Sequence, residues 1–295
     1  MLQQLTIVIT CTDRKTRVPS PQLTARTLPQ GTVEQRCGEW VSRVSTSPVE
    51  DVPLRQLYKG GTWQQFLQLV ADAADNWATR PLVASAGLGL QELDSSLPSY
   101  AATFSPGHAD SACAASVSGE WWAGLRNVPG ARPMNELTGP VLAVLSSAYS
   151  RAMHEDLAAL AARSDVDLLL VGGWQDVAGA TRIPADRALR GALGGTVGSL
   201  LPRMARHWLA IGAGRSLTST ETAGEWSRWA TGVRSEETVA RRAMTHADVM
   251  DFVHSLRRSQ PKVSATSALR TLRDAGFACE QKRFGRLFRM TQEAA

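Results

Sequence analysis

Residues 5–15 read LTIVITCTDRK, an almost continuous apolar run followed at once by polar and charged side chains. Short apolar runs that end in this way are typical of strands buried on both faces of a parallel sheet. Further runs of this kind lie at 81–86, 140–146, 167–172 and, most weakly, 207–212. Helical patterns separate them at 63–77, 110–125, 150–163 and 195–206. The alternation predicts an α/β fold, a three-layer sandwich around a central sheet of four to five mainly parallel strands.

The 295 residues are enough for a large domain and a small one. We expect an α/β domain over residues 1–213 that carries the site, a linker or bridging helix over 214–240, and a small basic helical domain over 241–295. The last part contains three helical patterns, separated by Pro261 and Gly276. These helices resemble a helix-turn-helix module, and an accessory bundle that packs on the body is the alternative.

The net charge of +5 is unevenly distributed, because residues 1–233 are balanced and the whole basic excess falls in 234–295. A neutral body with a basic tail predicts a polyanionic partner, and we expect this partner to be nucleic acid. A solvated helical face with surplus arginine is the alternative. The candidate DNA-binding side chains are the following basic residues of the last domain: Lys262, Arg270, Arg273, Lys282, Arg283 and Arg286.

The sequence lacks the motifs of several classes of protein, and these classes are therefore not expected. The 4 cysteines and 5 histidines show no metal-ligand spacing, so we expect no metal and no disulfide framework. No dinucleotide fingerprint, phosphate-binding lysine loop or serine nucleophile elbow occurs, and we expect no cofactor. The chain has neither a long apolar stretch nor a secretory start, so we expect a cytoplasmic protein without a membrane partner. Nothing in the sequence implies an obligate protein partner.

The loops that follow the predicted strands contain most of the polar side chains that could perform chemistry. Ligands of open parallel sheets bind at the carboxyl ends of the strands, where these loops converge. Four such loops would bring the following side chains around one cleft: Asp13, Arg14, Lys15, Tyr149, Arg151, Trp174 and Asp176.

Three segments resemble a known family when they are taken in order. TIVITCTDRKT at 6–16, LRQLYKGGTWQQF at 54–66 and PLVASAGLGLQELDSSLPSYAATFS at 81–105 are similar to the YaaA-related superfamily. That family shows a first strand ending in Cys and Lys, an L-Y-x-[SG] segment, and a strand ending in S-A-x-x-G-L that leads to P-x-Y. The matching residues are Cys11, Lys15, Leu57, Tyr58, Gly60, Ser85, Ala86, Gly89, Leu90, Pro98 and Tyr100. The Asp13-Arg14 pair and the length of residues 12–56 depart from the family pattern.

The resemblance implies a fold similar to uracil-DNA glycosylases and to domains of deazaguanine base-modifying enzymes. In the glycosylases, a loop after the first strand carries a water-activating aspartate, and a later serine-containing loop contacts the DNA backbone. Asp13 and residues 146–151 stand at the corresponding places. Length, fold and basic tail also resemble bacterial glycosylases that excise modified bases from phage DNA. The implied activity is removal of a modified base, such as glucosylated hydroxymethylcytosine, leaving an abasic site as antiviral defence.

Cleavage of an N-glycosidic bond develops positive charge on the sugar, which a nearby carboxylate stabilises. The base must first be extruded from the duplex into a pocket with apolar or aromatic walls. We therefore expect Asp13 and Arg151 to be catalytic. The expected substrate-binding residues are Cys11, Thr12, Arg14, Lys15, Tyr58, Ser85, Gly87, Glu92, Tyr100, Ser147, Tyr149 and Trp174.

Each of these assignments has a structural alternative. Asp13 could cap a turn or pair with Arg14 or Lys15, and Glu92 offers a second carboxylate. Cys11, Tyr58 and Tyr100 could be packing residues. Two other functions fit the same sequence: a deazapurine base-modifying enzyme that leaves the glycosidic bond intact, and a non-enzymatic DNA-binding stress protein.

Overall fold

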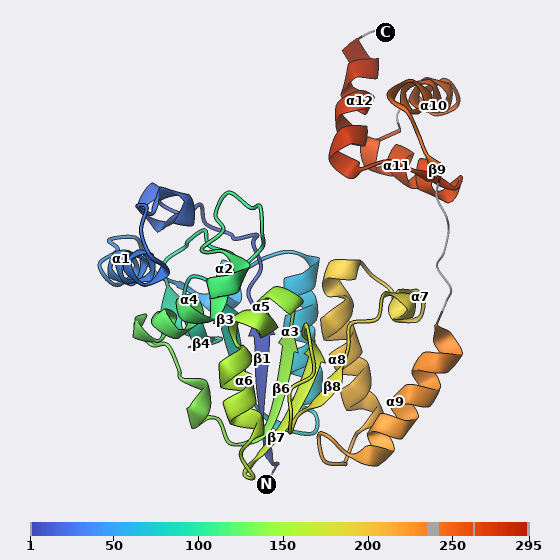
Figure 1. Ribbon diagram of the computed structural model, residues 1–295. Coiled ribbons are helices and arrows are strands. Elements are labelled where there is room, and N and C mark those ends of the chain that lie inside the picture. The colour runs from blue at the N-terminus through green and yellow to red at the C-terminus, as the bar shows by residue number, and fades with distance from the viewer. Residues whose placement is uncertain (1, 235–241, 262, 294–295) are drawn as a thin grey trace. The chain divides into compact units, whose positions relative to one another are not determined.

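The computed structural model describes residues 2–234, 242–261 and 263–293 and divides the chain into two compact units, Met1–Ser235 and Glu236–Ala295 (Figure 1). Each unit has a hydrophobic core of its own. In the described part of the chain, no helix has the length and apolar character needed to cross a membrane.

The first unit alternates strands and helices along the chain, as the sequence predicts. Its strands are β1 Gln4–Thr10, β2 Val52–Pro53, β3 Ala78–Ser85, β4 Gly89–Glu92, β5 Ser96–Leu97, β6 Gly139–Leu145, β7 Val166–Gly172 and β8 Thr181–Ile183. Its α-helices are α1 Val33–Ser45, α2 Leu54–Leu57, α3 Gly61–Ala73, α4 Ser118–Gly124, α5 Ser147–Ala152, α6 His154–Ala161, α7 Arg190–Leu193, α8 Leu200–Ile211 and α9 Thr220–Val233.

The central sheet has six strands in the order β4-β3-β1-β6-β7-β8. All neighbouring pairs are parallel except β3 with β4, so the prediction of a mainly parallel sheet is confirmed. The predicted count of four to five strands is too low. The sequence signal misses β4 and β8 because both are short and carry polar residues, among them Gln91 and Arg182.

Helices cover both faces of this sheet and complete the three layers (Figure 1). On one face, α3 packs against α8, and both contact strands of the sheet. On the other face, α5 contacts β6 and α6 contacts β7, with α4 against α5 and α1 against α4. Strands β1, β6 and β7 are buried almost throughout, and β3 is buried over its second half, because helices cover both faces of the sheet.

Two of the predicted elements are wrong in kind or extent. Residues 207–212, predicted as a strand, lie mostly in α8, whose buried residues follow the helical period. A short apolar run does not distinguish a strand from one side of a buried helix, and here the packing against α3 decides. The helix predicted over 110–125 contains α4 only in its second half, and the long connection 12–56 contains α1.

The segment 214–240, predicted as a linker or bridging helix, contains α9, and this helix is part of the first unit. Trp226 and Ala230 are buried in the first core. The indole N–H of Trp208 on α8 donates to the carbonyl of Leu217 at 2.9 Å, which ties the α8–α9 connection to α8. The first unit thus extends beyond residue 213, and residues 235–240 lie outside the described residues.

The second unit is mainly helical and consists of β9 Arg242–Ala243, α10 His246–Ser259, α11 Ala265–Asp274, β10 Phe277–Ala278 and α12 Gln281–Glu293. Thr245 and Asp248 form the capping box at the start of α10, and Ser264 caps α11. The helices enclose a core that includes Leu272 and Phe284. The small helical domain predicted from these caps and apolar spacings is therefore confirmed as a helical C-terminal part.

We expect Trp226→Ala to lower the free energy of unfolding of the first unit by about 3–5 kcal/mol, because it empties a buried site between α8 and α9. Arg228→Ala, at an exposed position of the same helix, is the control and should change stability by less than about 0.5 kcal/mol. Urea unfolding followed by tryptophan fluorescence measures this unit alone, since all 9 tryptophans precede residue 230. Equal stability of the two variants would contradict the placement of α9 in this core.

Candidate active site at the carboxyl edge of the sheet

The strand order places a topological switch point at β1, where the connections between successive strands run to opposite sides of that strand. The chain passes from β1 to β3 on one side and then from β3 across to β6 on the other side of β1. In open α/β sheets, ligands bind outside the carboxyl ends of the strands at such a switch point. The residues that follow β1 and β6, at 11–15 and 146–151, flank it.

Three buried hydroxyl groups form a chain beside this point. The hydroxyls of Tyr58 and Tyr100 lie 2.9 Å apart, and the Tyr100 hydroxyl also hydrogen-bonds Ser85 Oγ. Ser85 Oγ accepts the backbone N–H groups of Gly87 at 3.1 Å and Leu88 at 3.0 Å. These three predicted substrate-binding side chains are therefore brought together, but all three are buried.

A second pair of polar groups connects the ends of β1 and β3 to α5. Cys11 Sγ lies 3.0 Å from the hydroxyl of Tyr149, and this hydroxyl accepts the backbone N–H of Ala86 at 3.1 Å. The ring of Phe104 packs edge-on against Tyr149 with centroids 5.2 Å apart. Burial is the main cause that raises the pKa of Tyr149, and equally of Tyr58 and Tyr100, well above the ordinary value, with Cys11 adding to the rise. The three phenols are consequently neutral hydrogen-bonding groups.

Lys15 places an amine over this buried cluster. Its Nζ lies 4.2 Å from the ring centroid of Tyr100 and 5.6 Å from that of Tyr58. An isolated antiparallel bridge to Tyr58 holds its backbone. Burial lowers the pKa of Lys15, while Cys11, Asp13 and Asp110 act in the opposite direction. Its amine donates a long hydrogen bond of 3.5 Å to the backbone carbonyl of Asp13.

Asp13 lies outside the buried cluster, although it is two residues from Lys15. Its side chain is 70% exposed, and its Oδ2 is 3.9 Å from Nε2 of His108. The sequence prediction of a carboxylate beneath an enclosed pocket is thus not what the fold presents. Asp13 is a solvent-accessible carboxylate at the carboxyl end of β1, next to a partly buried amine.

Arg151 and Trp174 form another exposed group, at the carboxyl ends of β6 and β7. The Arg151 guanidinium lies 4.9 Å from the Trp174 ring, which is 40% exposed. The backbone N–H of Trp174 donates to the buried Ser150 Oγ at 3.1 Å, which fixes the start of the loop. Arg151 was predicted at a helix start, but α5 begins at Ser147 and Arg151 lies in its last turn. A cation there is favoured by the helix dipole, so its position alone does not indicate function.

Glu92, the alternative carboxylate, does not join the site. It lies on β4 opposite Leu82, while Ser85 at the strand end is opposite Gly89. This register places it about 10 Å back from the carboxyl edge. Its carboxylate is paired with Arg80 at 2.7 Å. Glu92 is therefore a structural partner of an arginine.

The remaining predicted side chains at this edge have backbone partners or are open to solvent. Thr12 Oγ1 donates to the carbonyls of Arg14 at 3.2 Å and Lys59 at 3.3 Å. Arg14 is exposed. Ser147 is exposed, and its Oγ donates to the carbonyl of Gly173 at 3.4 Å.

The loop after β3 is packed by aromatic side chains that sequence reasoning did not assign to the site. Trp40 Nε1 donates to the carbonyl of Gly87 at 2.7 Å, and Trp121 Nε1 donates to that of Ala86 at 2.8 Å. A Cβ at Gly87 would lie 2.4 Å from the Tyr100 ring, so only glycine fits there. The helical spacing of Cys37, Trp40 and Val44 could have identified Trp40 as buried, but no helix was predicted within residues 12–56.

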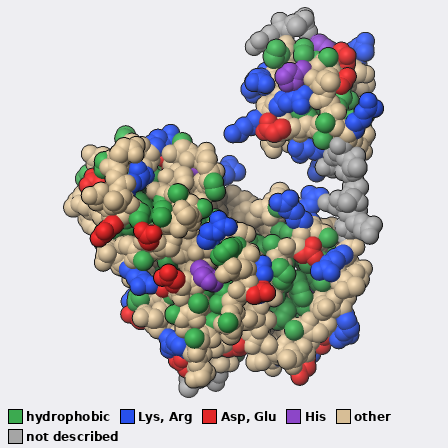
Figure 2. All heavy atoms as spheres, in the orientation of Figure 1, with side chains coloured by type: hydrophobic (Ala, Val, Ile, Leu, Met, Phe, Trp, Pro, Cys, Tyr) green, Lys and Arg blue, Asp and Glu red, His purple; other side chains and the backbone are tan. Residues whose placement is uncertain are grey.

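The basic residues of the second unit fall into two groups. Lys282, Arg286 and Arg289 are exposed, follow the helical spacing along α12 and line a hollow of about 630 Å³. Figure 2 shows several Lys and Arg side chains on the visible face of the second unit. Arg283 is instead partly buried, and its guanidinium donates to the carbonyl of Met244 at 2.7 Å. Of the other predicted residues, Arg270 is exposed, Arg273 donates to the carbonyl of Cys279 at 3.4 Å, and Lys262 lies outside the described residues.

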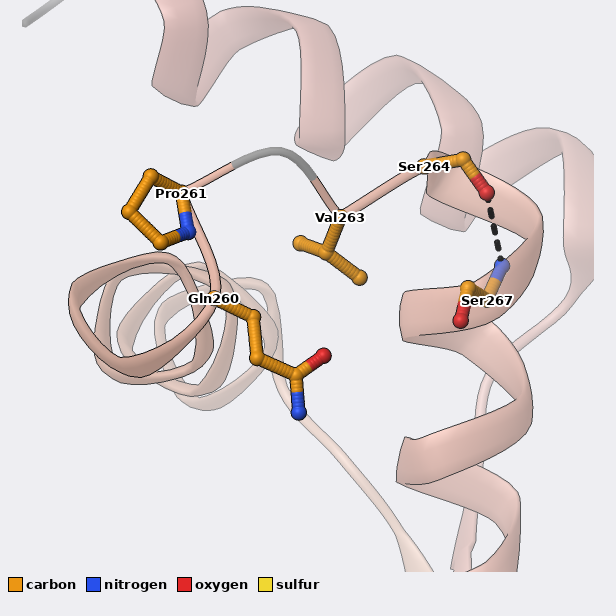
Figure 3. A pocket seen from close by; sticks show the side chains of 5 residues that line it. All are labelled: Gln260, Pro261, Val263, Ser264 and Ser267. Carbon is orange, nitrogen blue, oxygen red and sulfur yellow. Dashed lines mark hydrogen bonds between the residues drawn. The ribbon is translucent and has the colours of Figure 1, made fainter.

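A second hollow of about 640 Å³ opens where α10 gives way to α11. It is lined by the neutral residues Gln260, Pro261, Val263, Ser264 and Ser267 (Figure 3). Ser264 Oγ is occupied by the N–H of Ser267 at 3.2 Å, which caps the helix (Figure 3). Among the described residues that line this hollow, there is no charged group for a phosphate and no reactive group for catalysis.

The described residues contain no group of three or more His, Cys, Asp or Glu side chains that could hold a metal ion.

Comparison with known proteins finds no matching family model, no matching curated protein and no matching solved structure.

We expect Ser85→Ala to destabilise the first unit by about 2–4 kcal/mol, because it leaves the buried N–H groups of Gly87 and Leu88 without an acceptor. Ser147→Ala removes a weak, exposed bond at the same edge and is the control, with an expected change below about 0.5 kcal/mol. Urea midpoints by tryptophan fluorescence test both. A Ser85→Ala variant as stable as the wild type would show that the hydroxyl chain does not hold this loop.

Proposed function

We propose that the chain is a DNA glycosylase with a uracil-DNA-glycosylase-like fold, which hydrolyses the N-glycosidic bond of a modified base. The substrate we propose is glucosylated hydroxymethylcytosine in phage DNA, and the abasic site left behind would serve antiviral defence. The observation that carries the proposal is the pair formed by Asp13 and Lys15, an accessible carboxylate and a partly buried amine at the switch point of the sheet.

The two groups suit the charges that develop during the reaction. Breaking the bond between the sugar and the base builds positive charge at C1′ and negative charge on the departing base. A carboxylate close to C1′ stabilises the first charge or orients the attacking water, and a cation stabilises the second. Asp13 is exposed and can approach a sugar, while the protonated Lys15 can lie toward the base. Arg151 is a second cation at this edge.

Recognition of an extruded base requires an aromatic or apolar surface. The three tyrosines are too deeply buried to form that surface directly, so we assign them to the floor of the site. Trp174 is the exposed aromatic ring at the same edge, and Arg151 lies over it. An incoming base could replace Arg151 on this ring or stack on its other face.

The basic side chains of α12 support DNA as the partner. Lys282, Arg286 and Arg289 present three exposed cations along one helix, and exposed lysines and arginines are the side chains that contact the phosphate backbone of nucleic acids. We propose that the second unit binds the DNA backbone and that the first unit acts on the base.

One observation favours the base-modifying alternative. The thiol of Cys11 lies at the same edge, 3.0 Å from the Tyr149 hydroxyl, and thiols are nucleophiles in covalent base chemistry. A modifying enzyme changes the mass of the nucleoside, whereas a glycosylase releases the base. Mass analysis of digested substrate DNA therefore distinguishes the two.

We expect the protein to release free base from glucosylated phage DNA and to leave alkali-labile sites, with neither product from unmodified DNA. Asp13→Asn should lower the single-turnover rate about 10²–10³-fold, since it removes the charge that stabilises the sugar cation. Asp75→Asn is the control, because Asp75 is exposed and follows α3 at the opposite edge of the sheet. Chromatography of the liberated base measures the rate. Full activity in Asp13→Asn would remove this residue from the mechanism, and no release from any modified DNA would refute the function.

We expect Arg286→Glu to weaken DNA binding and to reduce the slope of log K against log salt concentration by about 1. Arg258→Glu, which makes the same charge change at an exposed site on α10, should alter the slope by less than half as much. Fluorescence anisotropy with a labelled duplex across a salt series measures both. Arg283 is unsuitable for this test because its guanidinium also holds the Met244 carbonyl. Identical slopes for the two variants would show that α12 does not contact the phosphates.

A further inference from the structure

Lys15 differs from an ordinary surface lysine in its surroundings. Its amine lies over the Tyr100 ring at 4.2 Å and near the Tyr58 ring, and within the described residues no ion pair to a carboxylate is formed. The hydrogen bond from this amine to the Asp13 carbonyl is long, at 3.5 Å. An amine held by rings and a weak bond can turn toward a substrate without breaking a salt bridge.

We propose that Lys15 is a nucleophilic amine, which forms a Schiff base with the C1′ aldehyde of an abasic deoxyribose and gives the protein a strand-cleaving lyase activity. This inference rests on the proposed function, because it assigns a second reaction to the same site. It also extends that function, since hydrolysis of the glycosidic bond alone needs no covalent intermediate.

The reaction balances with groups at this edge. The lone pair of the neutral Lys15 amine attacks C1′ of the ring-opened sugar, and the carbonyl oxygen takes up two protons and leaves as water. The resulting iminium acidifies the C2′ proton, which a base removes, and the C3′–O bond then breaks with the phosphate as leaving group. Water hydrolyses the imine and returns the amine. Asp13, two residues away and accessible, is the carboxylate placed to move these protons.

The surroundings of Lys15 make its ammonium group easier to deprotonate, so the protonated form can face the departing base and the neutral form can attack the abasic sugar. Burial lowers the pKa of Lys15, although the nearby Cys11, Asp13 and Asp110 oppose this effect. The two phenols beside the amine, those of Tyr58 and Tyr100, are neutral because burial raises their pKa values well above the ordinary value. A lysine amine that loses its proton more easily is the form that attacks carbonyl groups.

Lys59 is a matched control for this reactivity. It is the only other lysine of the first unit, and its backbone N–H donates to the carbonyl of Arg14, so it lies beside the same loop. Its side chain is exposed. A reaction that any nearby lysine performs would occur at Lys59 as well.

The test uses the full chain and a duplex that carries one preformed abasic site, with sodium cyanoborohydride to reduce the iminium to a stable amine. We expect a covalent protein–DNA adduct on a denaturing gel, and peptide mass mapping should place it on Lys15. Lys15→Arg should form at least about 10-fold less adduct than the wild type, while Lys59→Arg should form as much adduct as the wild type. The mapping is done on the wild-type chain, so it does not depend on the folding of a variant.

An adduct that is absent, or that maps to Lys59, to the chain's terminal amine or to a lysine of the second unit, would overturn the proposal. The preformed abasic site bypasses base excision, so this result is separate from the base-release assay. Base release without an adduct leaves the glycosylase proposal in place and refutes the lyase. An adduct at Lys15 without base release supports the amine and refutes the glycosylase. The rate of trapping should also level off below pH 10.5, the ordinary pKa of lysine.

Discussion

The carboxyl edge of the sheet depends on the hydrogen bonds of one buried side chain, the hydroxyl of Ser85. Ser85 is the last residue of β3, and its Oγ accepts two backbone N–H groups of the following loop and hydrogen-bonds the Tyr100 hydroxyl. Tyr100 in turn bonds Tyr58 and lies beneath the amine of Lys15. Because β1 and β3 are paired in parallel, with Thr10 opposite Ala84, this serine also sets the floor under the residues that follow β1. One buried oxygen thus connects the packing of the fold to the groups proposed for catalysis.

Much of the fold could be predicted from the sequence because four of its strands are buried on both faces and appear as apolar runs. The weaker elements depend on tertiary contacts that no local pattern shows. Strand β8 is three residues long and includes Arg182, which is stabilised by the carbonyl of Gly172. The run at 207–212 is helical because it continues the buried stripe of α8 toward α3 and α9.

The sequence also predicted which side chains of the candidate site lie near one another, but not which of them are buried. The order of motifs brings Cys11, Tyr58, Ser85 and Tyr100 to one edge, since each follows or faces the end of a strand. The burial of these side chains could not be predicted from the order of the motifs, because it depends on how the loops fold. The tyrosines form the interior of this edge, whereas Asp13 is exposed, because its loop turns outward beside His108 while Lys15 pairs with Tyr58.

The loop after β3 has a further consequence for recognition. The N–H groups of Ala86, Gly87 and Leu88 all have acceptors within the protein, and the carbonyls of Ala86 and Gly87 accept from Trp121 and Trp40. A glycine-containing turn at a strand end often cradles an oxyanion with free amides. This turn has no such amides to offer at those three positions. For the function proposed above, selectivity at this loop would therefore depend on side chains, and exchanging them would change the selectivity while the backbone of the loop stays the same.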